Sequence, residues 1–309
     1  MRLRAGLFRE RSARAAAHNA DGRARWRAAV NQFSDHTEAE LRARLGYRRG
    51  GDRPGRSASL RTVRRRAHRG AAGAPLPDAV SWTGRLASAN FTRDQGNCGS
   101  CWAAAAVGAL ETHAELAHGR AAPLSHDMLV RCTRNPRKCG GSGGCDGATA
   151  ELAFEYATQY GVADEADLAT WQSCDGGSKP RVVAQGYVQL PMNEARPLRH
   201  ALSTEGPVVV SVEANDWFMY GGGIFDKCQI DAEVDHAVLL VGYGHEAGSL
   251  YWQIRNSWGY SWGERGHLRL LRLGDEGDDA HCGTDRSPQL GAWCEGGPGE
   301  VRVCGTCGI

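Results

Sequence analysis

The spacing of hydrophobic positions changes part-way along this chain. Residues 101–118 carry alanine, leucine and tryptophan at helical spacing, and Gly119 follows as a stop signal. A second helical pattern covers about residues 148–160 and ends at Gly161. We therefore expect two helices in this part of the chain, the first of them buried.

Beyond Pro180 the apolar residues form short runs separated by glycine-rich turns. Such runs predict strands, here at residues 208–212, 237–243, 251–256 and 267–273. Helices first and strands later indicate an α+β fold with two packed lobes.

The first 74 residues differ from the rest. Residues 3–19 are rich in alanine and arginine and predict a helix from propensity. Residues 37–46 predict another, with Thr37 as its cap and Glu40 three residues on. Residues 50–73 have no apolar period and are typical of an exposed linker that is easily cut.

Charge divides the chain in the same region. Residues 1–70 contain 19 arginines and 6 acidic residues, a balance of +13, and the other residues hold 18 basic and 29 acidic, a balance of −11. Opposite charges on one chain indicate an internal electrostatic partnership. A nucleic-acid patch at residues 61–69 is the alternative, which the lack of aromatic interleaving and of any nucleic-acid motif disfavours. We therefore do not expect nucleic acid as a partner. No run approaches the roughly 18 apolar residues of a membrane span, so a membrane is not expected as a partner either.

All eleven cysteines lie after residue 97. Such a number indicates an oxidising compartment, and an odd count suggests pairs plus one free thiol that could be reactive. We expect the lysosome, the vacuole or secretion. Because the first residues show no signal peptide, we also expect that the natural precursor begins further upstream.

Cys101 has the surroundings of a reactive thiol. It opens the alanine-rich helix, where free N–H groups and the helix dipole stabilise a thiolate. Gln95 lies just upstream, and its side-chain N–H, with the Cys101 backbone N–H, could stabilise an oxyanion. By itself, a cysteine before such a helix is more often a small buried hydrophobic residue.

Three segments resemble those of the papain-like cysteine peptidases. Residues 95–102, Gln-Gly-Asn-Cys-Gly-Ser-Cys-Trp, resemble the nucleophile signature of that family. Residues 234–244, around His236, resemble its histidine segment, and residues 254–263, around Asn256, its asparagine segment. Order and spacing also fit. The resemblance implies a papain-like two-lobed fold, with a helical left lobe and an antiparallel, barrel-like right lobe.

The resemblance also implies roles. Cys101 is the nucleophile, and His236 is the general base that later protonates the leaving amine. Asn256 orients the His236 ring, Trp258 shields that hydrogen bond from water, and Gln95 completes the oxyanion hole. We therefore expect a cysteine endopeptidase that acts on peptides and proteins, as a monomer and without metal or cofactor.

Residues implied to bind the substrate surround this set: Trp102, Gly147, Ala148, Thr149, Ser211, Val234, Asp235, Ala237 and Trp258. Trp102 is expected to floor the leaving-group side. Residues 144–148 resemble the strand whose backbone pairs with an extended substrate. The pocket for the second side chain before the cleaved bond is expected from Thr149, Ala150, Ser211, Val234 and Ala237. All five are small or apolar, which predicts acceptance of medium hydrophobic side chains.

Disulfides implied by the resemblance are Cys98–Cys145, Cys132–Cys174 and Cys228–Cys282. Cys101 aside, Cys139, Cys294, Cys304 and Cys307 remain, and they could form two further bridges. Because Cys304-Gly-Thr-Cys307 is a Cys-x-x-Cys, a zinc site is the competing interpretation.

The end of the chain allows two interpretations. Cys282 lies at about the family distance from Asn256, yet Cys307-Gly-Ile309 also resembles the start of the family's last strand. On the second interpretation residues 283–306 are an insertion and the final strand is cut off. The loop between Cys132 and Cys145 is longer than the family's compact form but has no histidine. That disfavours the occluding loop of the carboxydipeptidase cathepsin B and favours an endopeptidase.

The N-terminal part resembles the propeptide of cathepsin L-like precursors. Residues 29–35 resemble its Gly-x-Asn-x-Phe-x-Asp motif, and Phe8 and Asn19 match two positions of its helix motif, from which Arg11 and Ala15 depart. We expect residues 1–74 to be an N-terminally truncated, partly helical inhibitory propeptide with its linker. Residues 75–309 are then the peptidase domain with a cysteine-rich C-terminal extension. We further expect acid to weaken ion pairs between the two and so start autocatalytic cleavage.

Two other functions fit the sequence less well. A catalytically silent homologue used for binding is disfavoured by the complete catalytic set, and a zinc or redox module by the length of the chain. Asn90-Phe-Thr92 is a glycosylation sequon.

Overall fold

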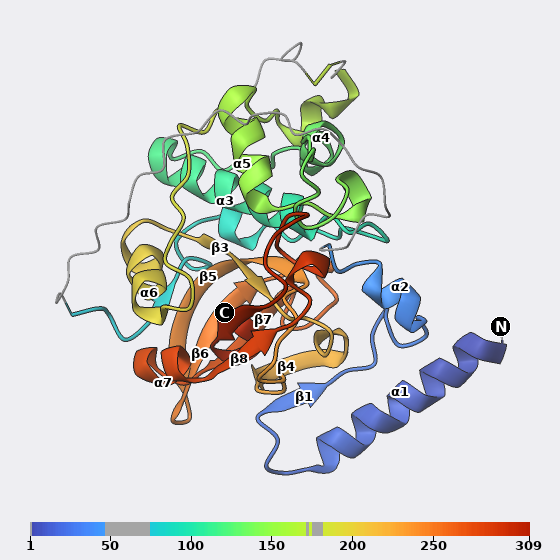
Figure 1. Ribbon diagram of the computed structural model, residues 1–309. Helices are drawn as coiled ribbons and strands as arrows, with labels where there is room; N and C mark the ends of the chain where they lie inside the picture. The colour runs from blue at the N-terminus through green and yellow to red at the C-terminus, as the bar shows by residue number, and fades with distance from the viewer. Residues whose placement is uncertain (1, 47–74, 171–172, 175–181) are drawn as a thin grey trace.

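The computed structural model describes residues 2–46, 75–170, 173–174 and 182–309. One lobe is helical, the other holds most of the strands together with two helices, and the N-terminal segment lies along the strand lobe (Figure 1). This is the expected α+β arrangement. Among the described residues no helix is both long and apolar enough to cross a membrane.

The helical lobe is built on α3 (Cys101–His118), with α4 (His126–Cys132) and α5 (Ala150–Gln159) packed around it. Residues 101–112 of α3 are all buried. Gly119 ends the helix in the left-handed conformation, with φ 68°, which glycine adopts without steric cost. The helix predicted over 101–118 is confirmed, and the one predicted over 148–160 begins two residues later.

The strand lobe is one sheet with the path β1-β4-β7-β6-β5-β2, and β3 pairs with β5 beside this path. Its long central strands are β5 (His236–Glu246) and β6 (Ser249–Arg255), which are antiparallel. The other members from the strand lobe are β2 (Val80–Ser81), β3 (Val208–Val212), β4 (Tyr220–Phe225) and β7 (His267–Arg272). All pairings are antiparallel except that of β4 with β7. The four strands predicted from sequence are confirmed as β3, β5, β6 and β7.

Two helices and a hairpin complete this lobe. Helix α6 (Ala195–Thr204) and helix α7 (Asp275–Ala280) pack against each other. Beyond α7, β8 (Cys282–Asp285) pairs with β9 (Val301–Cys304) in a separate two-stranded sheet. The cysteine-rich end of the chain therefore forms its own hairpin.

The N-terminal segment docks through an added strand. After α1 (Arg2–Ala20), β1 (Trp26–Ala28) pairs antiparallel with β4 and extends the sheet. Helix α2 (Glu38–Arg42) follows, and its capping box joins Thr37 and Glu40 as predicted. The helix expected to reach residue 46 ends at Arg42, and residues 44–46 run on into the space between the lobes.

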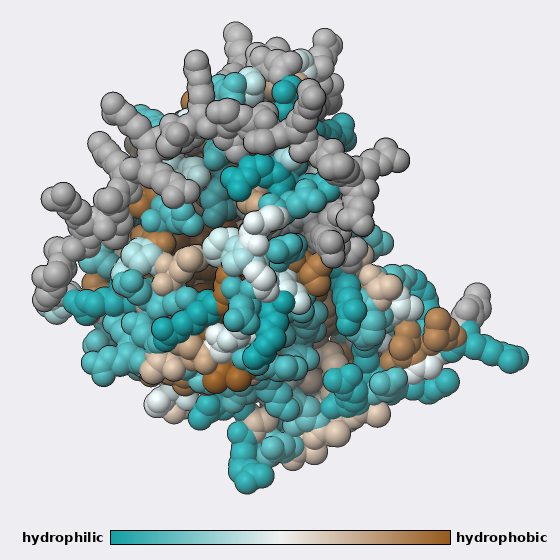
Figure 2. Space-filling model, viewed as in Figure 1, coloured by the Kyte–Doolittle hydropathy of each residue, from teal (hydrophilic) through white to brown (hydrophobic). Residues whose placement is uncertain are grey.

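Helix α1 makes few contacts with the rest of the molecule. Its two buried residues are Arg11 and Ala15, and Arg11 donates to the carbonyl oxygens of Phe33 and His36. Leu3 and Phe8 are 66% and 46% exposed, and apolar surface shows at the free end of the helix (Figure 2).

Candidate active site

Cys101 is the first residue of α3 and is wholly buried. Ten of the eleven cysteines form five disulfides, so this thiol is the free one. The backbone N–H of Ala237 donates to its Sγ over 3.4 Å. Burial raises the pKa of Cys101 to about 12, although backbone N–H groups of Ala237 and Gly46 act to lower it. In this state the thiol is protonated.

His236 begins β5 next to the nucleophile's hydrogen-bond donor. Its Nε2 lies 2.8 Å from Asn256 Oδ1, and the backbone N–H of Ser257 donates to the same oxygen over 2.8 Å. Since an amide oxygen only accepts, Nε2 carries the proton and Nδ1 has a free lone pair. Within the described chain Nδ1 has no hydrogen-bond partner. Burial lowers the pKa of His236 to about 4, with the Asn256 bond opposing it, so the ring is a neutral base here.

Aromatic rings enclose the His236–Asn256 pair. The Trp258 ring lies 5.1 Å from the His236 ring, and Phe218 stacks on Trp258 at 4.4 Å and 9°. Trp217 meets His236 edge-on at 6.3 Å. These rings keep water from the hydrogen bond that orients the imidazole. Trp258 lies beside this hydrogen bond, where the resemblance places it.

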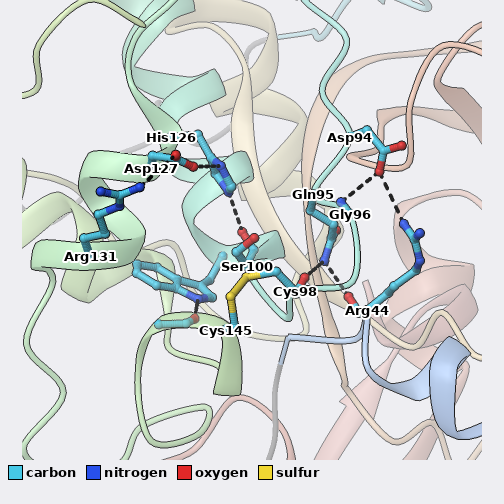
Figure 3. The surroundings of a disulfide bond; sticks show 12 residues. Arg44, Asp94, Gln95, Gly96, Cys98, Ser100, His126, Asp127, Arg131 and Cys145 are labelled. Carbon is cyan, nitrogen blue, oxygen red and sulfur yellow. Dashed lines mark hydrogen bonds and ion pairs between the residues drawn. A yellow bond between two sulfur atoms is a disulfide. The ribbon is translucent and has the colours of Figure 1, made fainter. Parts of the chain in front are cut away.

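Gln95 is held with its amide nitrogen facing the nucleophile loop. Ser257 Oγ donates to Gln95 Oε1 over 2.6 Å, which leaves Nε2 as the donor group. Nε2 donates to the carbonyl oxygen of Cys98 over 2.8 Å and to that of Arg44 over 2.6 Å (Figure 3). An N-terminal peptide carbonyl therefore occupies the bond that a substrate oxyanion would need.

Gly46 lies directly on the nucleophile. A Cβ at this position would fall 2.4 Å from Cys101 Sγ and 2.6 Å from the carbonyl oxygen of Gly99. On the other side, a Cβ on Gly147 would fall 2.1 Å from the Gly46 carbonyl oxygen. The main chain of the N-terminal segment thus fills the space between the thiol and the expected substrate strand.

Further contacts fix this segment on the strand lobe. The Phe33 ring is 1% exposed and packs edge-on against Phe218 at 5.3 Å and Trp258 at 5.5 Å. Gln32 Nε2 donates to the carbonyl oxygen of Trp258 over 2.8 Å. Arg44 pairs with Asp94 at 3.3 Å. The same aromatic rings therefore shield the histidine and hold the covering segment.

Comparison with known proteins decides the family. Residues 76–291 match the model of the papain family cysteine proteases. The chain belongs to this family.

Relatives of the papain-family chain include precursors. It is 36% identical to cathepsin S of Mus musculus over 82% of this chain and 72% of the relative, and 33% identical to a cathepsin L-like proteinase of Phaedon cochleariae over 92% and 85%. Among solved structures, digestive procathepsin L 3 of the Tenebrio molitor larval midgut superimposes with a TM-score of 0.73 at 30% identity, covering 89% of this chain and 87% of that one. A recombinant stem bromelain precursor gives 0.71 at 28% identity over 88% and 85%. The papain-family chain is a cysteine endopeptidase made as a zymogen, and its N-terminal segment is the prosegment.

Two of the three disulfides implied by the resemblance are confirmed, Cys98–Cys145 and Cys132–Cys174. The third, Cys228–Cys282, is wrong. The register of β8 and β9 sets Cys282 opposite Cys304, with which it forms a disulfide, and Cys228 pairs with Cys307 instead.

The remaining disulfide, Cys139–Cys294, joins the two lobes. Because all four thiols of the zinc interpretation lie in disulfides, they are not available as ligands. The pairing of Cys307 with Cys228 favours the interpretation in which residues 283–306 are an insertion.

The predicted substrate residues fall into several places. Ala148, Thr149 and Ala237 are buried in or beside the helical-lobe core, and Ser211 pairs with Ala237 between β3 and β5. Within the substrate strand the residues with positive φ are Gly144, at 58°, and Gly147, at 92°, and Ala148 is not one of them. The alanine therefore fits at that position without strain.

Trp102 and Asp235 are both buried. Trp102 Nε1 donates to the Gly144 carbonyl oxygen over 3.3 Å, so in the precursor it is a core residue that ties α3 to the substrate strand. Asp235 accepts from the backbone N–H of Ala214 over 2.9 Å and from Asn215 Nδ2 over 2.5 Å. Burial raises the pKa of Asp235 well above its ordinary value.

The sequon residue Asn90 is exposed. Its Nδ2 donates to the carbonyl oxygens of Thr83 and Leu86 over 2.7 and 3.2 Å. A glycan would replace one of the two hydrogens that make these bonds.

Sequence reasoning missed two residues of the site. Ser257 anchors both Gln95 and Asn256, and it stands inside the Asn-Ser-Trp segment, so the motif itself carried the signal. Gly46 has no such signal, because nothing in the sequence relates a glycine after α2 to a cysteine 55 residues away.

Proposed function

We propose that Cys101 and His236 carry out the peptide-bond cleavage, with Gln95 and Asn256 in supporting roles. The observation that carries this proposal is the meeting of a free thiol with an asparagine-bound histidine. Cys101 Sγ accepts the N–H of Ala237, the residue directly after His236, and His236 is oriented by Asn256 at 2.8 Å.

Each step uses one of these groups. His236 Nδ1 takes the thiol proton, and the thiolate attacks the carbonyl carbon of the peptide bond. The N–H groups of Gln95 and Cys101 stabilise the oxyanion that forms. The tetrahedral intermediate collapses, and His236 gives its proton to the leaving amine. Water, deprotonated by His236, then hydrolyses the thioester and restores the thiol.

The docked prosegment prevents this reaction in the precursor. With both groups buried, Cys101 and His236 stay neutral because ion-pair formation in a dry site carries a desolvation cost. Gly46 lies where the attacked carbonyl group would lie. The Arg44 carbonyl oxygen accepts the hydrogen bond that Gln95 Nε2 would donate to the oxyanion. Removal of the prosegment admits water and substrate and permits the thiolate–imidazolium pair.

The domain limits and the compartment also belong to this proposal. Residues 1–74 form the prosegment and its linker, and residues 75–309 the peptidase with its cysteine-rich extension. The family match, which begins at residue 76, supports this limit. Five disulfides support a lysosomal, vacuolar or secreted location. We expect the cut that releases the prosegment between about residues 70 and 75. Residues 70–74 lie outside the described residues.

The experiment is kinetic. After release of the prosegment, the chain will hydrolyse a fluorogenic peptide, and Cys101→Ser will abolish this activity. Gln95→Ala will lower kcat by about 10²–10³-fold, as expected for loss of an oxyanion donor. Unchanged kcat in Gln95→Ala would assign the oxyanion to another group, and activity in Cys101→Ser would overturn the proposal.

A further inference from the structure

Residues 286–300, between β8 and β9, form a loop that we call the strap. The strap is closed at its base by Cys282–Cys304. In Figure 1 the red C-terminal segment rises from the strand lobe toward the helical lobe. Neither the catalytic proposal nor the prosegment explains why an enzyme would tie its C-terminal hairpin to the opposite lobe.

The lower part of the strap rests on Val234, two residues before His236. The Val234 backbone N–H donates to Asp285 Oδ2 over 3.3 Å. A Cβ on Gly291 would fall 2.0 Å from the Val234 carbonyl oxygen. The strap backbone is therefore packed directly against a residue of the expected pocket wall.

The tip of the strap is fixed to the helical lobe by three kinds of bond. Cys294 forms a disulfide with Cys139, and the backbone N–H of Gly140 donates to the carbonyl oxygen of Trp293 over 3.0 Å. Glu295 lies 3.3 Å from Lys138. Residues 291–295 thus run from Val234 of the strand lobe to residues 138–140 of the helical lobe.

This crossing lies beside the place that the prosegment backbone takes. A Cβ on Gly147 would fall 2.1 Å from the Gly46 carbonyl oxygen and 2.2 Å from that of Gly140. Gly140 is the residue bonded to Trp293. The strap is consequently one residue away from the strand expected to pair with the substrate.

Ala292, midway between the two anchors, packs against the hydrophobic cluster of the helical lobe. That cluster contains Ala148, Ala150 and Ala237, the last two of which are expected to line the pocket for the second side chain before the cleaved bond. Ala292 therefore packs against the same cluster that contains two of the residues expected to line the pocket.

We propose that the strap forms the end wall of this pocket and that Ala292 is part of this wall. The strap would then restrict the pocket to small substrate side chains such as alanine. The proposal rests on the proposed function of the site and replaces the expectation of medium hydrophobic side chains. A strap pinned by a disulfide cannot move aside to admit a leucine or phenylalanine side chain.

The test compares two fluorogenic peptides that differ only in alanine or leucine at the second position before the cleaved bond. With the full chain after prosegment release, kcat/KM will be higher for the alanine peptide. Cys139→Ser/Cys294→Ser will release the strap tip and raise the leucine-to-alanine ratio about tenfold or more. Cys132→Ser/Cys174→Ser is the matched control, since it removes another disulfide of the helical lobe, and will leave the ratio unchanged.

Ala292→Gly keeps every disulfide and will raise the leucine-to-alanine ratio severalfold. This variant tests the proposal even if the double cysteine variant does not fold. Titration of active sites with an epoxysuccinyl inhibitor separates the two proposals. Active sites with an unchanged ratio in both strap variants would overturn the strap proposal alone. Absence of active sites in the unaltered processed chain would overturn the proposed function.

Discussion

Single atoms decide whether Cys101 can react. Its sulfur lies among the N–H of Ala237, the main chain of Gly46 and the helix that it opens, and the prosegment packs directly against it. The pKa of about 12 for the thiol and of about 4 for His236 both follow from burial. The precursor therefore holds a neutral pair between these two pH values, and cleavage competence depends on exposing it.

Gly46→Ala will open the nucleophile in the precursor. The added Cβ would lie 2.4 Å from Cys101 Sγ, so residue 46 must move away. We expect alkylation of Cys101 by iodoacetamide in the uncleaved precursor to be about tenfold faster, which corresponds to about 1.4 kcal/mol of weakened docking. Gly22→Ala is the control in the same prosegment, where a Cβ meets nothing within 4 Å. Equal alkylation rates in both variants would contradict the place assigned to Gly46.

At the residue scale the proposed catalytic residues could be selected from the sequence because they stand in three short motifs with fixed order. Pairing of Cys228 was not predictable in the same way. Its partner depends on the register of β8 with β9, a contact between segments whose turn residues fit no short hairpin signal.

At the scale of helices and strands, predictability follows the strength of the local pattern. The helix α3 and the strands β3, β5, β6 and β7 were predicted because each is rich in apolar residues, and α3 and β5 also bury long continuous stretches. Helix α6 was missed. It is amphipathic, but Pro197 stands in its first turn, a position where proline is tolerated although it usually reads as a helix breaker.

Strand β1 was missed for a different reason. It has three residues, and its burial comes from the neighbouring strand rather than from its own pattern. Trp26 packs on Phe225 at 4.9 Å, and Asn19 bonds both backbone groups of Ala28. Only the partner sheet makes this segment a strand.

At the scale of the whole molecule, burial outweighs the charge asymmetry in holding the prosegment. Among the described residues, Arg25–Asp226 at 3.6 Å and Arg44–Asp94 at 3.3 Å link it to the peptidase. Each pair leaves one partner about half exposed to water, and pairs open to water contribute about 0–1 kcal/mol each, whereas burial of a ring such as Phe33 contributes several. The arginine-rich residues 61–69 lie outside the described residues, so release by loss of ion pairs in acid stays a prediction.

Two buried carboxyl groups favour the folded molecule in mild acid over mild alkali, whereas His236, whose pKa burial lowers to about 4, acts in the opposite direction. Burial, with the charges of Asp216 and Glu233, raises the pKa of Glu213 to about 7. Burial raises that of Asp278 to about 7 as well. The unfolded chain ionises these groups near pH 4–4.5, so their contribution is fully present below that pH and is lost as pH rises through 7.

Denaturant unfolding of the Cys101→Ser precursor at pH 5 and pH 8 measures how its stability depends on pH. We expect Glu213→Gln to raise the free energy of unfolding at pH 8 relative to that at pH 5, because it removes a buried group that must ionise above pH 7. The same difference with and without Glu213→Gln would contradict the assignment.

Covalent labelling tests the central claim most directly. The processed chain is incubated with an epoxysuccinyl thiol inhibitor, and the modified residue is located by mass spectrometry of peptides. We predict one label, on Cys101, which is lost in His236→Ala and nearly absent in the uncleaved precursor. No label on Cys101 after release of the prosegment, or equal labelling in His236→Ala, would contradict a nucleophile activated by His236.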